Sequence, residues 1–111
     1  MSLNKLEIIK KNDVTLTPTF TDENDDFVDI SSANLVFTVK DYFDSATASI
    51  SKAVASGLHT DPTNGITEIN LTDDETDISA GDYYYDIELT FGDGRVNSTK
   101  YGKLIIKEKI T

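Results

Sequence analysis

The stretch DISAGDYYYDIELTFGDGRV, residues 77–96, decides the fold of this chain. From Tyr83 to Phe91 the odd-numbered residues are aromatic or aliphatic, whereas most of the even-numbered residues are polar. This period of two is typical of a β-strand with one buried face. The glycine-rich triplet that follows supplies the residues of a hairpin turn. The stretch therefore predicts a strand in which Tyr83 and Tyr85 point inward and Tyr84 points outward.

The same alternation recurs along the chain. Clusters rich in Asp, Asn, Gly and Pro separate most of the alternating runs, and such clusters favour turns. Six to eight short strands with turns between them are typical of a β-sandwich or a β-barrel. The other runs with apolar residues at alternate positions are Leu6/Ile8, Val14–Phe20, Leu35–Val39, Thr67–Leu71 and Leu104/Ile106.

Two segments need a closer reading. Ala46, Ile50 and Val54 have helical spacing, but Ile50 and Val54 also fit one face of a strand. We expect a strand, because its length suits the architecture; Lys52 would share that face and would then need an edge or a solvent position. Thr72-Asp73-Asp74-Glu75 has the T-x-x-E form of a capping box and predicts one short helical turn near residues 73–79.

Length and composition limit the class of protein. With 111 residues, the expectation is a single domain spanning 1–111. The net charge of −10 opposes binding to nucleic acid and to anionic membranes. Cysteine is absent, so disulfides, thiolate nucleophiles and Cys-ligated metals are excluded. The first residues lack the apolar stretch of a signal peptide, so we expect a product that is cytosolic when made, unless it leaves by lysis or as part of a particle.

No catalytic motif emerges from the titratable residues. His59, the one histidine, lies in a polar loop without a nucleophile motif beside it, and we expect a plain loop residue. Asp86 and Glu88 lie on the outward face of one strand, where water screens their charges. The acidic loops do not match an EF-hand, because in a loop that begins with Asp22 as position one, position six is Phe27 instead of glycine. We therefore expect no catalytic residue, no cofactor and no specific metal ligand; a looser calcium site among residues 73–77 stays open.

Gly81, Tyr83 and Tyr85 are expected to form a structural corner. In immunoglobulin-like sandwiches a tyrosine near the start of a strand buries its ring, and its hydroxyl bonds back to the backbone. The Gly81-Asp82-Tyr83 triplet suits such a corner, because glycine eases the tight entry. Tyr84, on the opposite face, is the candidate contact to a partner, since aromatic side chains are enriched at interfaces.

Residues 50–107 resemble a recurring immunoglobulin-like domain of bacteriophage tail and baseplate proteins. They are similar to the amino-terminal domain of upper baseplate proteins. The pattern consists of a strand ending in Leu-Thr, a short turn containing Thr, a Gly-x-Tyr-x-Tyr strand, a Gly-Arg-Val hairpin and a closing Gly-x-Leu strand. The residues that match it are Lys52, Gly57, Leu58, Asp61, Pro62, Gly65, Ile69, Leu71, Thr72, Thr76, Ile78, Gly81, Tyr83, Tyr85, Ile87, Leu89, Gly94, Arg95, Val96, Gly102, Leu104 and Ile106.

The resemblance implies an all-β, immunoglobulin-like antiparallel sandwich of about seven strands that acts as a non-enzymatic virion structural protein. Its partners would be other tail or baseplate proteins or further copies of itself, and the protein would reside in the virion. Contacts would use sandwich faces and edge strands, with LEIIKK (residues 6–11) and LIIKEK (residues 104–109) as candidate edges. The alternative is a carbohydrate-binding or cell-surface adhesion module, for which Tyr84, Tyr42 and Tyr101 are the candidate outward aromatics.

Overall fold

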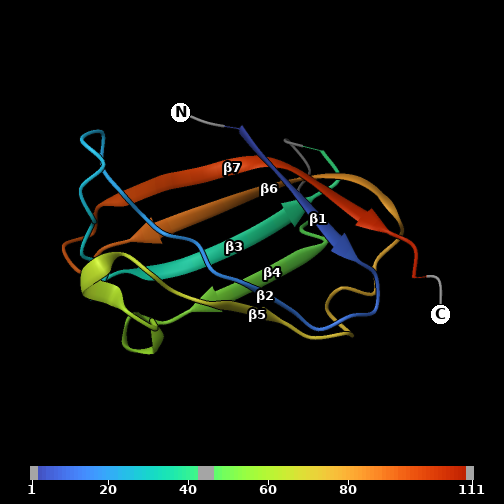
Figure 1. Cartoon of the computed structure of the whole chain (residues 1–111), viewed down its shortest axis with the longest axis horizontal. Helices are drawn as coiled ribbons and strands as arrows, with labels where there is room; N and C mark the ends of the chain where they lie inside the picture. Colours follow the sequence, from blue (N-terminus) through green and yellow to red (C-terminus); the bar gives the residue numbers. More distant parts are fainter. Residues whose placement is uncertain (1–2, 43–46, 110–111) are drawn as a thin grey trace.

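The computed structural model describes residues 3–42 and 47–109. Within them the chain forms strands joined by turns, with two single turns of 3₁₀ helix (Figure 1). The strands are β1 (Leu3–Ile9), β2 (Val14–Leu16), β3 (Asn34–Lys40), β4 (Ile50–Val54), β5 (Ile69–Leu71), β6 (Gly81–Thr90) and β7 (Val96–Lys107), and the 3₁₀ turns are η1 (Ser56–Leu58) and η2 (Pro62–Asn64).

These strands form two sheets that share one core. The larger sheet has the order β1-β7-β6-β3-β4, and the smaller sheet pairs β2 with β5. Burying each large apolar side chain between them contributes about 1.5–3 kcal/mol. The buried apolar side chains are Ile8, Phe20, Ile30, Ala33, Leu35, Phe37, Val39, Ile50, Val54, Ile69, Leu71, Tyr83, Tyr85, Ile87, Leu89, Phe91, Leu104 and Ile106.

β6 lies at the centre of the larger sheet, hydrogen-bonded in antiparallel register to β3 on one side and β7 on the other. Its odd-numbered side chains from Tyr83 onward are buried, and its even-numbered side chains from Tyr84 to Thr90 are half-buried. The predicted alternation is therefore confirmed for this strand. Between Ile87 and Glu88 the pairing with β7 shifts by one residue, which marks a β-bulge and a local increase in twist.

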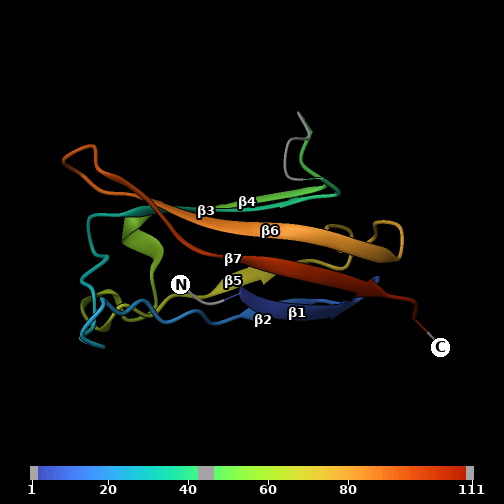
Figure 2. The same ribbon diagram turned by 90° about the horizontal axis from the view of Figure 1, so that it is seen from above.

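β1 pairs with β7 in parallel, although the other pairings are antiparallel. In Figure 2 the larger sheet curls, so that β7 lies between the two layers and β1 lies at the level of β2. This pairing corrects two expectations. The sandwich is not purely antiparallel, because its larger sheet is mixed. β1 is an edge strand, as predicted for LEIIKK, but the LIIKEK segment is not, because β7 has β6 and β1 on its two sides.

β4 forms the opposite edge of the larger sheet, which confirms the strand prediction for residues 50–54. Ala46, which belonged to the helical alternative, lies outside the described residues. Lys52 has the inward parity of Ile50 and Val54, and the edge position lets its amine reach Glu75, with 3.1 Å between Nζ and Oε1.

The capping box forms, but it does not begin a helix. The N–H of Thr72 donates to Oε1 of Glu75 at 2.9 Å, and the N–H of Glu75 donates to Oγ1 of Thr72 at 3.2 Å. The N–H of Thr76 then donates to the Thr72 carbonyl and the N–H of Asp77 to the Asp74 carbonyl, and the chain continues through Ile78 toward β6 without forming a helix. The helical turn expected at 73–79 is thus a single hydrogen-bonded turn, and the 3₁₀ turns lie at η1 and η2 instead.

Candidate functional site

The corner before β6 is built from Gly81 and Tyr83. Gly81 has φ +150°, a backbone conformation that residues with a Cβ rarely adopt. The ring of Tyr83 is buried, and its hydroxyl donates to the Ser79 carbonyl at 2.6 Å. This is the geometry of a tyrosine corner. Burial, together with the negative charge of Asp41, raises the pKa of Tyr83.

Tyr85 also points inward, where it packs on Phe37 of β3. Their ring centroids lie 6.0 Å apart with an interplanar angle of 41°, which is a favourable tilted arrangement. Burial raises the pKa of Tyr85. In antibody domains a tryptophan and a disulfide fill the middle of the sandwich. Here the rings of Phe37 and Tyr85, from neighbouring strands, occupy part of the core between the sheets.

Tyr84 faces the other way, into a groove on the outer face of the larger sheet. The groove has a volume of about 460 Å³. Tyr42 and Tyr101 line it together with Tyr84, although Tyr42 lies just after the end of β3 and Tyr101 belongs to β7. Tyr42 is 67% exposed, and the other two rings are half-buried. The remaining residues that line the groove are Thr38, Lys40, Tyr85, Asp86 and Glu88.

The strand register explains why these three tyrosines meet. Tyr101 of β7 stands opposite Asp86 of β6, and Asp86 is the next outward-facing residue after Tyr84. Lys40, the last residue of β3, stands opposite Tyr84, and Tyr42, two residues beyond the end of that strand, lines the same groove. Side chains directly opposite on neighbouring strands lie within about 5.5 Å at Cβ. The sequence spacing alone, 42, 84 and 101, gives no sign of this proximity.

Charge is distributed unevenly along the groove. Tyr84 is flanked by Lys40 on β3 and Lys103 on β7, so this end is cationic. Asp86 and Glu88 follow on β6 and make the other end anionic. Both carboxylates are half-buried, where their charges are less screened than on a fully exposed surface. The groove therefore presents aromatic faces beside two acidic groups.

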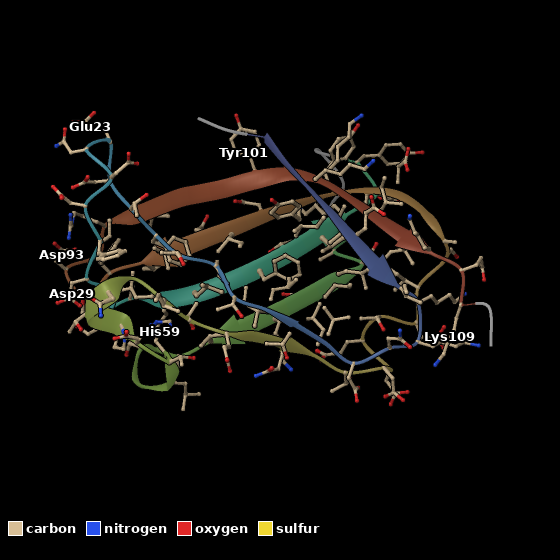
Figure 3. All side chains as sticks on the ribbon, in the orientation of Figure 1. Glu23, Asp29, His59, Asp93, Tyr101 and Lys109 are labelled. Atoms are coloured by element: carbon tan, nitrogen blue, oxygen red, sulfur yellow. The ribbon has the colours of Figure 1, made fainter. Side chains whose placement is uncertain are left out.

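His59 is a structural residue. Its side chain is 8% exposed, between η1 and η2, whereas the sequence indicated a plain loop residue. A carbonyl oxygen can only accept, so Nε2 donates to the Ala33 carbonyl at 2.6 Å, and Nδ1 shares a hydrogen bond of 2.9 Å with the Thr67 hydroxyl. Figure 3 shows His59 at the end of the sandwich where Glu23, Asp29 and Asp93 also lie.

The acidic loop residues bond to their own backbone. Oδ1 of Asp22 accepts from the N–H groups of Asn24 and Asp26. Asp29 accepts from both the hydroxyl and the N–H of Ser31, and these bonds lower the pKa of Asp29. Within residues 3–42 and 47–109, no three acidic or histidine side chains gather closely enough to hold a metal ion, and this includes the carboxylates at 73–77.

A second groove, of about 510 Å³, opens between β1 and the segment that continues β2. Leu6, Leu16 and Pro18 form its sides, and the core residues Tyr85 and Ile87 lie at its floor. β1 and β2 are each the last strand of their sheet, so each has one edge without a strand neighbour in the described part of the chain. Lys5, Thr17 and Thr19 complete the lining of this groove.

Comparisons with known proteins place the fold. No protein-family model matches the sequence, and no curated protein matches it. Among solved structures, Tim-2 superposes with a TM-score of 0.51 at 10% identity, covering 100% of this chain and 97% of that one. A chain of the ZIG-8–RIG-5 IG1–IG1 heterodimer superposes with a TM-score of 0.44 at 13% identity, covering 96% and 84%. A chain from a study of multimeric cell-adhesive interactions of VGSC beta subunits gives 0.43 at 12% identity, covering 96% and 92%.

The chain has an all-β, immunoglobulin-like sandwich fold, as the sequence predicted. These comparisons do not test the phage assignment, which stays a prediction. In the part of the chain that the structure describes, no helix has the length and apolar character needed to span a membrane.

Proposed function

We propose that this protein is a non-enzymatic binding module of the adhesion type, which recognises a macromolecular partner through the groove on the outer face of the larger sheet. One observation carries the proposal: Tyr42, Tyr84 and Tyr101, from three separate segments, line a single groove of about 460 Å³. Exposed or half-exposed tyrosines supply large, rigid contact area at low entropic cost, and they are enriched at interfaces.

The absence of a catalytic role is part of the same proposal. General acid–base chemistry needs a titratable group within reach of a substrate. Both ring nitrogens of His59 are bonded to Ala33 and Thr67, away from the tyrosine groove. Asp86 and Glu88 lie on an open sheet face, and the residues that line the groove include no histidine or cysteine. This arrangement supports binding more than turnover.

A panel of immobilised glycans and peptides, probed with the labelled protein, tests the proposal. We expect the wild-type protein to bind a defined subset, and Tyr42→Ala to reduce that binding at least several-fold. Tyr42 is 67% exposed, so the substitution leaves the core intact. Phe27→Ala is the matched control, because Phe27 is 59% exposed on a loop outside the groove. Binding that Tyr42→Ala and Phe27→Ala reduce equally, or no binding at all, would contradict the proposal.

A second candidate is the virion role, in which the protein assembles with tail or baseplate proteins or with further copies of itself. The groove between β1 and β2 supports it, because two strand edges border an apolar floor there. An extended segment from another chain can add to such edges. If copies assemble in this way, the purified protein forms an oligomer that Leu16→Lys dissociates. A monomer at all concentrations would contradict self-assembly.

A further inference from the structure

The acidic end of the tyrosine groove has a defined arrangement. Asp86 and Glu88 occupy successive outward positions on β6, which places their Cα atoms about 6.6 Å apart. Tyr101 stands opposite Asp86 on β7, and the β-bulge lies immediately before Glu88. Aromatic faces and carboxylates therefore converge on the same part of the sheet surface. A ligand that fits there must satisfy both.

A cationic side chain satisfies both. Guanidinium groups stack on aromatic faces and donate to carboxylates in a bidentate manner, and ammonium groups make the same two contacts as compact charges. The chain itself contains one such arrangement at the β6–β7 hairpin. The guanidinium carbon of Arg95 lies 4.8 Å from the centroid of the Phe91 ring, and its Nε donates to Asp93 at 2.8 Å.

We propose that the tyrosine groove accepts a basic side chain, arginine or lysine, carried by a protein partner. This inference rests on the proposed function and names its ligand class. Lys40 and Lys103 flank Tyr84, so the cation enters at the other end, over Asp86 and Glu88. The net charge of −10 adds a long-range attraction for a basic partner and raises its association rate.

The test is a titration of the ¹⁵N-labelled full chain, followed by its amide signals in NMR spectra. The probes are Nα-acetyl-arginine amide, Nα-acetyl-glutamate amide and methyl glucoside. We expect the arginine probe to shift the amide signals of Thr38, Tyr84, Asp86, Glu88 and Tyr101, and the other two probes to leave them in place. Weak binding is expected from a single side chain, so the readout is the set of shifted residues and the concentration at half-saturation.

Two substitutions separate specific binding from general charge attraction. Glu88→Gln removes one carboxylate of the groove, and we expect the half-saturation concentration for the arginine probe to rise by about threefold to fivefold. Glu23→Gln makes the same change in net charge on a loop at the end of the sandwich, and we expect no change. Equal effects of both substitutions would overturn the proposal in favour of non-specific attraction.

The probes also separate this inference from the proposed function. If methyl glucoside or the glutamate probe shifts the groove residues and the arginine probe does not, the groove still binds a ligand, but the ligand class proposed is wrong. If none of the probes shifts the groove residues and no member of the glycan and peptide panel depends on Tyr42, both the ligand class and the binding role of the groove are wrong.

Discussion

The hydroxyl of Tyr83 donates to the carbonyl oxygen of Ser79 at 2.6 Å, which fixes the chain where it turns into β6. This bond joins the last residues of the β5–β6 loop to the strand at the centre of the larger sheet. Because β6 carries both the core tyrosines and the outward Tyr84, the position of the groove depends on this corner.

Removing that hydroxyl should destabilise the protein without changing its core. For Tyr83→Phe we expect the free energy of unfolding to fall by about 1 kcal/mol, the net value of one intramolecular hydrogen bond. Urea unfolding measures it. Tyr42→Phe is the control, because that ring is 67% exposed, and we expect a change within about 0.5 kcal/mol. Equal stability of Tyr83→Phe and the wild type would show that the corner bond contributes nothing.

Two tyrosines should resist ionisation. Burial raises the pKa of both Tyr83 and Tyr85, with a further contribution from Asp41 at Tyr83. A tyrosine in the unfolded chain titrates near pH 10, so above that pH the unfolded state loses these protons first. Stability is therefore full below about pH 10 and falls as the pH rises through the higher pKa values of the folded protein.

Ultraviolet absorbance of tyrosinate, recorded alongside unfolding curves at rising pH, measures this effect. We expect part of the increase in tyrosinate absorbance to appear only at the higher pH at which the protein unfolds. If all five tyrosines of the native protein titrate together near pH 10, the two rings are not buried as described.

Glu75 should govern part of the acid stability. Hydrogen bonds from the backbone N–H of Thr72 and from Lys52 lower the pKa of Glu75, although burial opposes them. A glutamate in the unfolded chain titrates near pH 4.3, so the stabilisation is present above that pH and is lost as the pH falls through the lower folded pKa. For Glu75→Gln we expect a loss of about 0.5–1.5 kcal/mol at neutral pH and a smaller further loss in acid.

Unfolding curves between neutral pH and acid check this expectation. Asp74→Asn is the matched control, because it removes an exposed carboxylate from the same turn. An acid profile of Glu75→Gln that matches the profiles of the wild type and of Asp74→Asn would contradict the role given to Glu75.

Gly65 should tolerate no side chain. It has φ +71°, and a Cβ there would lie 2.5 Å from the Phe20 carbonyl oxygen and 2.9 Å from that of Val28. Both contacts are to backbone, so for Gly65→Ala we expect a loss of about 2–4 kcal/mol. Gly94 has φ +92° with open space around it, so Gly94→Ala should cost about 1 kcal/mol. Thermal unfolding of the two variants checks the order, and equal losses would contradict it.

Local patterns in the sequence were enough to predict much of the fold. The alternation from Tyr83 to Phe91 predicts β6 because a strand half-buried in a sandwich has a period of two. The reciprocal bonds of Thr72 and Glu75 follow from their spacing. Features that depend on pairing between distant segments were harder to predict. The parallel pairing of β1 with β7 made the LIIKEK segment an inner strand, and no local pattern signals such a pairing.

The site shows the same division between local and long-range information. Tyr84 could be placed outward from parity alone, but its proximity to Tyr101 depends on the β6–β7 register. His59 lies in a polar stretch, and its burial follows from the way residues 56–64 fold against Ala33 and Thr67. Many of the residues that resemble the phage domain, such as Tyr83, Ile87 and Leu104, are buried. They indicate the sandwich fold more than a particular biological role.

The two faces of β6 form both the core and the outward groove, and cysteine scanning tests them directly because the natural chain contains no cysteine. The variants are Ile87→Cys, Glu88→Cys, Leu89→Cys and Thr90→Cys, each treated with a thiol reagent under native conditions. We predict that the thiols at positions 88 and 90 react readily. The thiols at 87 and 89 should react at least about 100-fold more slowly, because only transient opening of the fold exposes them. Rapid reaction at 87 and 89, with protection at 88 and 90, would contradict both the sandwich core and the outward groove.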